Sequence, residues 1–206
     1  ARRRFPPGRG TGCGGGGGGA AAGGGTTFVQ LSGAVLNIAT GGPPNPVATV
    51  QVGSGSTTPN VVDGSFFLSV PTGSTSAAVI FTPTAGSPTT FRFNFPALTA
   101  DTDLGDLFVG PEKITVNGRI FKATDAQPLP GATITLAGKS ATSDANGTFT
   151  IADVAYDPDA PGGFLSLQGR ASATGFFGAT FSPVAGPVGG VATLDDLFLS
   201  NDSGNT

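Results

Sequence analysis

Two groups of aspartates are spaced closely enough along the chain to share a cation. Asp101, Asp103 and Asp106 form the pattern D-x-D-x-x-D, and Asp195-Asp196 is a shorter group further on. Carboxylate oxygens are ligands that Ca²⁺ prefers, so the longer group raises a calcium site as one interpretation. The spacing and terminal glutamate of an EF-hand loop are absent, and aspartate is common in turns. We therefore expect solvated turns and no bound metal.

Side chains that usually carry catalysis are scarce. The chain has no histidine and one cysteine, Cys13, which excludes histidine-based triads, thiolate zinc clusters and a disulfide within the chain. We therefore expect no catalytic residue, no cofactor and no enzyme activity. Cys13 precedes a glycine tract, as the lipid-bearing cysteine of a lipoprotein does, but Gly10 is not the apolar residue that this motif requires. An unpaired thiol and a disulfide to another copy stay open.

Covalent modification has two kinds of candidate. The acceptor pattern for N-glycosylation occurs at Asn146 and Asn201, in Asn146-Gly147-Thr148 and Asn201-Asp202-Ser203. Both are expected on exposed turns or tails, although Asn-Gly also favours a tight turn by itself. Some surface β-sandwiches carry isopeptide crosslinks between lysine and asparagine or aspartate. The candidate lysines here are Lys113, Lys122 and Lys139.

Charge is sparse and unevenly distributed. Charged residues make up 11% of the 206 residues, against roughly 25% in an ordinary soluble domain. Positions 1–25 carry four arginines and no acid, a formal charge of +4, so the total of −3 leaves −7 for the rest of the chain. An acidic folded part repels phosphate, which argues against nucleic acid as a partner. No apolar run approaches the length of a transmembrane segment.

Residues 1–26 form a low-complexity arm. Glycine occupies almost half of positions 1–25, so the arm has few side chains to bury and cannot fold alone. Ordering an arm of this length costs about 25–50 kcal/mol, and backbone hydrogen bonds to a partner are the main resource that offsets this cost. We expect an extended arm whose contacts with a neighbouring copy involve Arg2, Arg3, Arg4, Phe5 and Cys13.

From Thr26 onward the sequence pattern predicts β-structure. Short runs rich in Val, Ile, Thr and Phe alternate in polarity, and Gly, Pro, Asn and Asp separate them. Phe91, Phe93 and Phe95 alternate with polar residues, and Phe149 and Ile151 are predicted to point into a core. No long stretch keeps a helical period free of Gly and Pro. The predicted fold class is all-β.

The β-region contains an internal repeat. Four blocks recur in the same order: 29–36 and 114–121, 46–52 and 130–136, 62–66 and 145–149, 104–109 and 194–199. Insertions between the blocks fall in loops while the strands persist, which predicts two homologous domains. We place them at residues 27–110 and 111–200, followed by a tail at 201–206. The short joint Gly110-Pro111-Glu112 predicts a semi-rigid rod.

The second repeat resembles the carboxypeptidase regulatory-like domain family. The resemblance is carried by Val116-x-Gly118-x-Ile120, Pro128-Leu-Pro-Gly131-Ala-Thr-Ile134-x-Leu136, Asp144-Ala-Asn-Gly147-Thr-Phe149 and Ala173-Thr-Gly175-Phe176. The first repeat follows this pattern less closely. The resemblance implies two tandem transthyretin-like, immunoglobulin-type β-sandwiches, which in this family are usually non-catalytic modules of secreted or surface proteins.

These observations lead to a structural hypothesis for function. A surface rich in Thr, Ser, Gly and Ala and free of Met favours an extracellular or cell-surface protein. An arm that inserts into the next copy makes a contact that does not close on itself, and such contacts propagate into filaments. We expect a homopolymer, an extracellular filament or surface layer, with glycans as a further partner class. A monomeric adhesion or carbohydrate-binding module and an accessory pair of domains from a larger secreted enzyme are the alternatives.

Overall fold

The fold is all-β, as the sequence predicts. The computed structural model describes residues 26–45, 47–160, 169–182 and 187–202, and every regular element within them is a strand. Among these residues, no helix is present that has the length and apolarity to cross a membrane. Strands β1 to β7 and strands β8 to β15 form separate sheets, so the prediction of two tandem β-sandwiches is confirmed, whereas the domain boundaries stay a prediction.

The first sandwich consists of two sheets. One sheet has the order β4-β1-β7, made of β1 (Phe28–Asn37), β4 (Ser65–Pro71) and β7 (Thr102–Val109). The other has the order β3-β2-β5-β6, made of β2 (Thr49–Val52), β3 (Gly55–Thr57), β5 (Ser76–Phe81) and β6 (Thr89–Asn94).

The second sandwich repeats this plan. One sheet has the order β11-β8-β14, with β15 also paired to β8, made of β8 (Glu112–Lys122), β11 (Thr148–Tyr156), β14 (Val191–Thr193) and β15 (Leu197–Leu199). The other has the order β10-β9-β12-β13, made of β9 (Thr133–Leu136), β10 (Lys139–Thr142), β12 (Gly169–Ser172) and β13 (Ala179–Phe181). In both sandwiches the first strand pairs antiparallel on one side and parallel on the other.

The polarity alternation along the strands places their apolar faces in the core. Phe91 and Phe93 on β6 are buried, and so are Phe149 and Ile151 on β11, because successive side chains of a strand point to opposite faces. The inward direction predicted for Phe149 and Ile151 is therefore confirmed. Phe67 on β4 follows the buried Phe66 and is 72% exposed, so the same alternation turns this aromatic side chain outward.

The Asn146-Gly147 turn is tight but does not close a hairpin within one sheet. The Gly147 N–H donates to the Asp144 carbonyl, and Asp144 Oδ1 accepts the Thr148 N–H at 2.9 Å. The turn connects β10 to β11, which belong to different sheets. Gly147 has φ of 71°, and a Cβ there would overlap the Ile120 carbonyl. The glycine thus permits β8 to lie directly against the turn.

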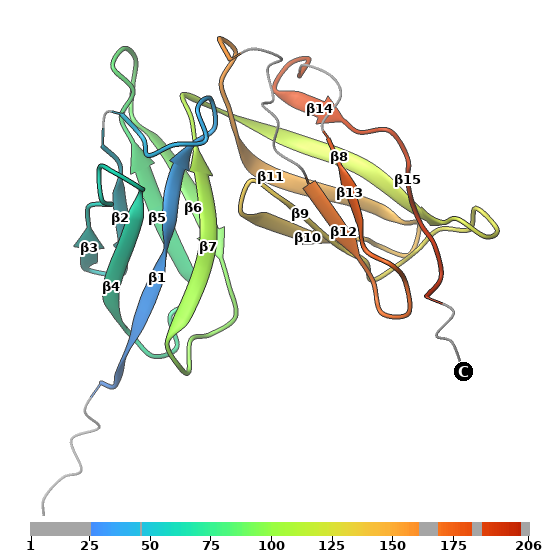
Figure 1. The fold of residues 1–206 in the computed structure, drawn as a ribbon, viewed down its shortest axis with the longest axis horizontal. Coiled ribbons are helices and arrows are strands. Elements are labelled where there is room, and N and C mark those ends of the chain that lie inside the picture. The colour runs from blue at the N-terminus through green and yellow to red at the C-terminus, as the bar shows by residue number, and fades with distance from the viewer. Residues whose placement is uncertain (1–25, 46, 161–168, 183–186, 203–206) are drawn as a thin grey trace, which may run out of the picture.

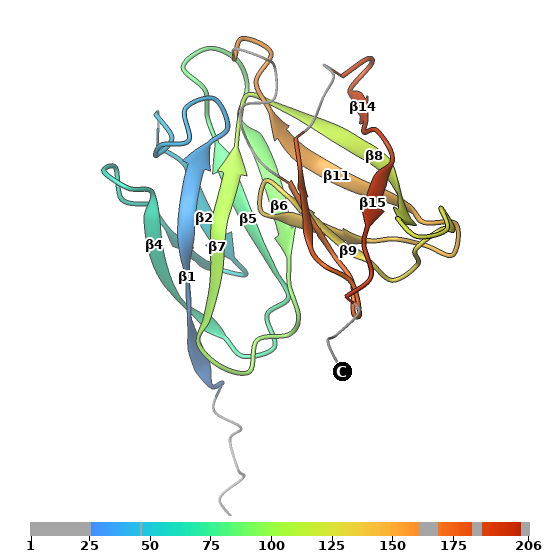
Figure 2. The same ribbon diagram turned by 45° about the vertical axis from the view of Figure 1, so that its right-hand side comes forward.

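The two sandwiches lie side by side rather than end to end. Figure 1 shows the strands of the first sandwich running in a different direction from those of the second, and the turned view keeps the two adjacent (Figure 2). This arrangement differs from the rod that the short joint predicted. The joint is held close to both sandwiches, since a Cβ on Gly110 would lie 2.7 Å from Cγ2 of Ile38 and 2.8 Å from the Tyr156 carbonyl oxygen.

Candidate functional site

A buried lysine connects the second sandwich to the first. Lys139 begins β10 and is only 9% exposed. Its Nζ donates to the Arg92 backbone carbonyl on β6 and lies 4.4 Å from the centroid of the Phe93 ring. A carbonyl acceptor and an aromatic face both stabilise an ammonium group that is removed from water. Lys139 therefore acts as a polar link across the junction.

Further polar contacts lie at the same junction. Lys113 Nζ on β8 donates to the Thr90 carbonyl at 3.3 Å and pairs with Asp153 Oδ1 at 3.4 Å. Thr89 Oγ1 donates to the Pro111 carbonyl at 2.9 Å. These contacts join β6 of the first sandwich to β8 of the second and to the joint at Pro111, and the ion pair with Asp153 fixes Lys113 against β11. The two bodies are thus held at several points.

Burial lowers the pKa of Lys139 to about 8, because the ammonium loses water on entering the junction. The charge of Asp153 acts in the opposite direction, and that of Lys113 lowers the pKa further. A cavity of about 340 Å³ is lined by Lys139 and Asp153, among other residues. Of the lysines considered for crosslinking, Lys113 and Lys139 thus make noncovalent contacts here, and Lys122 lies at the other end of β8.

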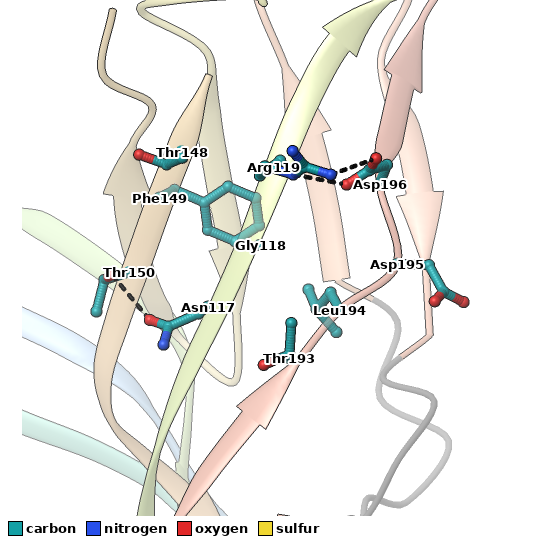
Figure 3. A pocket seen from close by; sticks show the side chains of 10 residues that line it. All are labelled: Asn117, Gly118, Arg119, Thr148, Phe149, Thr150, Thr193, Leu194, Asp195 and Asp196. Carbon is teal, nitrogen blue, oxygen red and sulfur yellow. Dashed lines mark hydrogen bonds and ion pairs between the residues drawn. The ribbon is translucent and has the colours of Figure 1, made fainter. Parts of the chain in front are cut away.

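A second feature is a hollow on the outer face of the second sandwich. It has a volume of about 600 Å³ and lies over β8 and β11, beside the chain between β14 and β15 (Figure 3). β14 ends where Thr193 pairs with Asn117, and β15 begins where Leu197 pairs with Ile120. The pairing with β8 is therefore interrupted after the Leu194 N–H, which donates to the Asn117 carbonyl. A Cβ on Gly118 would lie 2.5 Å from Cζ of Phe149. The absent side chain of Gly118 thus leaves room for the Phe149 ring on the core side. The hollow on the outer face forms beside the interrupted strand, over the backbone of Gly118.

Polar side chains surround this hollow. Arg119 binds Asp196 with two hydrogen bonds, from Nε to Oδ1 at 3.0 Å and from Nη2 to Oδ2 at 2.9 Å. Thr150 Oγ1 donates to Asn117 Oδ1 at 2.9 Å (Figure 3). The side chains of Arg119 and Asp196 are 57% and 37% exposed. The rim therefore presents groups that are held in place yet accessible to a ligand.

The first sandwich has a hollow at the equivalent position. Its volume is about 350 Å³, and its lining residues are Ser32, Gly33, Ala34, Phe67, Asp103, Gly105 and Asp106. The β1–β7 register shifts between Ser32 and Ala34, and a Cβ on Gly33 would lie 3.0 Å from the Phe66 ring. In both repeats the hollow therefore lies beside irregular pairing of the parallel neighbour, and a glycine there leaves room for a core phenylalanine.

The predicted aspartate groups do not form a metal site. Asp101 Oδ1 accepts the Gln30 N–H, and Asp103 Oδ1 accepts the Gly105 N–H. Within the described ranges, no three His, Cys, Asp or Glu residues are placed to hold a metal ion. Asp103 and Asp106 instead line the first hollow, and Asp195 and Asp196 line the second.

The other predicted residues divide into two groups. Arg2, Arg3, Arg4, Phe5 and Cys13 lie outside the described residues. Asn146 and Asn201 are both exposed, Asn146 in the turn before β11 and Asn201 in a bridge with Phe176. Their exposure agrees with the expectation for glycosylation acceptors, and glycosylation itself stays a prediction.

The sequence pattern indicated Asp195-Asp196 as a weak cation candidate but did not single out Arg119 or its pairing with Asp196. The internal repeat contained a usable signal, since Val-Asn-Gly-Arg-Ile-Phe at 116–121 aligns with Leu-Ser-Gly-Ala-Val-Leu at 31–36. Arg119 in one strand thus aligns with Ala34 in the matching strand, which marks a position where the two repeats differ in chemistry. Its partner Asp196 is 77 residues away in the chain, so only the fold identifies the pair.

No family model matches the chain, and no curated protein matches it either. The resemblance to carboxypeptidase regulatory-like domains therefore stays a prediction. Among solved structures, a type II cohesin–X-dockerin complex from Acetivibrio cellulolyticus is similar at 21% identity and a TM-score of 0.32, over 42% of this chain and 56% of that chain.

Two longer matches have lower identity. The Bacillus anthracis TIE protein is similar at 11% identity and a TM-score of 0.29, over 84% of this chain and 34% of that chain. Shaft pilin SpaA from Lactobacillus rhamnosus GG is similar at 13% identity and a TM-score of 0.28, over 86% of this chain and 99% of that chain. The match thus spans about half of the cohesin-complex chain and a third of the TIE protein. At these TM-scores the likenesses carry no inference about what this chain does.

Proposed function

We propose that this protein is a non-catalytic structural subunit of an extracellular filament or surface layer. In this assembly, residues 1–26 of one copy lie along the β-sandwiches of neighbouring copies. The observation that carries the proposal is the junction, where Lys139 and Lys113 both donate to backbone carbonyls of β6. A subunit that transmits force or maintains a lattice needs its two bodies held in one orientation, and several polar contacts across a short joint favour that.

The composition of the arm supports the same proposal. The four arginines within positions 1–25 are opposite in sign to the rest of the chain, whose formal charge is −7 because the total is −3. The arm and the body therefore attract each other at low ionic strength. When fully extended, an arm of this length reaches up to about 80 Å, which exceeds the dimensions of a domain of this size. A glycine-rich strand can add to an exposed sheet edge through backbone hydrogen bonds alone.

Deletion of the arm tests the proposal. The full chain and a chain that begins at Thr26 are purified, their folding is compared by circular dichroism, and their assembly is followed by negative-stain electron microscopy. We expect polymers from the full chain and dispersed, folded particles from the shorter one. A matched variant with the four arginines replaced by glutamine should assemble less at low salt. Dispersed particles from the full chain, or unchanged polymers from the shorter chain, would contradict the proposal.

A further inference from the structure

We propose that the hollow over Gly118 and the aromatic pair beside it form a binding site for a neutral oligosaccharide. The site, called here the Arg119 site, comprises Asn117, Arg119, Phe121, Thr150, Asp196 and Phe198. It lies on one outer sheet face of the second sandwich. This inference does not depend on the proposed assembly, because none of its residues belongs to the arm.

An exposed aromatic surface adjoins the hollow. Phe198 is 51% exposed, and its ring stacks on that of Phe121 with centroids 5.7 Å apart. Phe121 and Arg119 are two positions apart on β8, so they project from the same face, and the guanidinium carbon of Arg119 lies 5.3 Å from the centroid of the Phe121 ring. An aromatic ring face offers apolar contact area beside polar groups. A pyranose ring has a matching apolar C–H face.

The polar groups have unused capacity for hydroxyl groups. A guanidinium has five N–H donors, and the pair with Asp196 uses two of those of Arg119. The carboxylate of Asp196 can accept beyond these two bonds. Because Asn117 Oδ1 accepts from Thr150, the amide NH₂ of Asn117 is left to donate. The site therefore offers donors and acceptors side by side, which adjacent sugar hydroxyls require.

The charges favour a neutral ligand over an anionic one. Arg119 is already neutralised by Asp196 at 2.9 Å, and Asp195 adds an exposed carboxylate to the same rim. An anionic ligand would have to compete with Asp196 for the guanidinium and approach Asp195. A neutral polyhydroxyl ligand keeps the ion pair and uses its remaining hydrogen-bonding positions.

The first hollow provides an internal control. It likewise lies over the backbone of a glycine, but Ala34 stands where the second sandwich has Arg119, and Phe67 stands where it has Thr150. It therefore lacks the planar ion pair. We expect no oligosaccharide binding there.

Titration calorimetry of the full chain tests the proposal, with cellohexaose, chitohexaose, maltohexaose and xylohexaose as probes. At least one probe should bind. Arg119→Ala and Phe198→Ala should each weaken that binding about tenfold or more, as truncation of central interface residues does. Arg119→Lys should weaken it less, while Phe67→Ala should leave it unchanged. Circular dichroism shows whether each variant folds.

A measurement on the parent chain covers the case in which a variant does not fold. Amide chemical-shift changes on addition of the bound probe should map to residues 117–121 and 193–198, not to residues 32–34. The proposal is overturned if none of the four probes binds at millimolar concentration. It is equally overturned if the shifts map elsewhere, or if Arg119→Ala and Phe198→Ala bind the probe as the parent does. Heparin serves as an anionic comparison, and binding of heparin alone that salt abolishes would also overturn the proposal.

Discussion

The two sandwiches share a backbone plan and differ in what they place on it. In both, a glycine on the first strand lies over a buried phenylalanine of the antiparallel neighbour: Gly33 over Phe66, and Gly118 over Phe149. In both, the parallel neighbour departs from regular pairing beside that glycine. The hollow is therefore a property of the repeat.

The side chains beside the glycine differ. The first sandwich has Ala34 and an exposed Phe67, and the second has Arg119 and Thr150 at the matching positions. The difference shows that a repeated fold can supply the same cavity twice while only one copy acquires polar chemistry, since site chemistry depends on a few side chains rather than on the fold.

A second difference lies at the junction. All three lysines of the chain belong to the second sandwich, and two of them reach carbonyl groups of β6 in the first. The first sandwich contributes the carbonyl acceptors for these two lysines and the Phe93 ring. The repeats are thus asymmetric in their lysine contacts, because the second sandwich supplies both ammonium groups and the first supplies both carbonyl acceptors.

The largest expected effect tests what the repeats share. Gly64→Ala and Gly147→Ala should each lower the free energy of unfolding by about 2–4 kcal/mol, because both glycines have positive φ and a Cβ would overlap a carbonyl of β1 or β8. Urea titration measures the loss. Gly73→Ala and Gly175→Ala are the matched controls, since these positions have positive φ and open space, and each should cost about 1 kcal/mol. Equal losses in all four variants would refute the steric explanation.

The next prediction concerns the asymmetry at the junction. The pKa of Lys139 is lowered from 10.5 to about 8 in the folded protein. Between these pH values the unfolded chain binds a proton that the folded chain does not, so this lysine makes the free energy of unfolding rise with pH. Lys139→Met should remove that rise, and Lys122→Met should retain it. Urea titrations from pH 7 to 10.5 provide the comparison, and parallel profiles for the parent and Lys139→Met would show that burial does not shift this group.

The smallest expected effect concerns the difference between the hollows. Arg119→Ala should lower the free energy of unfolding by at most about 1 kcal/mol, because its pair with Asp196 is exposed. Asp106→Asn in the first sandwich, where no arginine stands opposite, should change it even less. Urea titration at low and high salt measures both. If Arg119→Ala lowered the free energy of unfolding by well over about 1 kcal/mol, the ion pair would serve folding rather than ligand binding.

Local sequence patterns predicted the features that depend on neighbouring residues. Alternation placed Phe149 and Ile151 in the core, and the Asn146-Gly147 dipeptide predicted a tight turn. The internal repeat predicted two homologous β-domains, and the family resemblance implied that each is a sandwich. That the turn crosses between sheets was not predictable, because the same glycine suits a hairpin and a close approach to another strand equally well.

The amino-acid sequence by itself determined the all-β fold class, the duplication and the inward faces of the strands, since period-two alternation and turn residues act over a few positions. Only the tertiary structure decided that the sandwiches lie side by side, that Lys139 enters the junction, and that Arg119 meets Asp196 across 77 residues. These contacts depend on which sheet edges and faces meet and on where a strand is interrupted, and no local pattern encodes either.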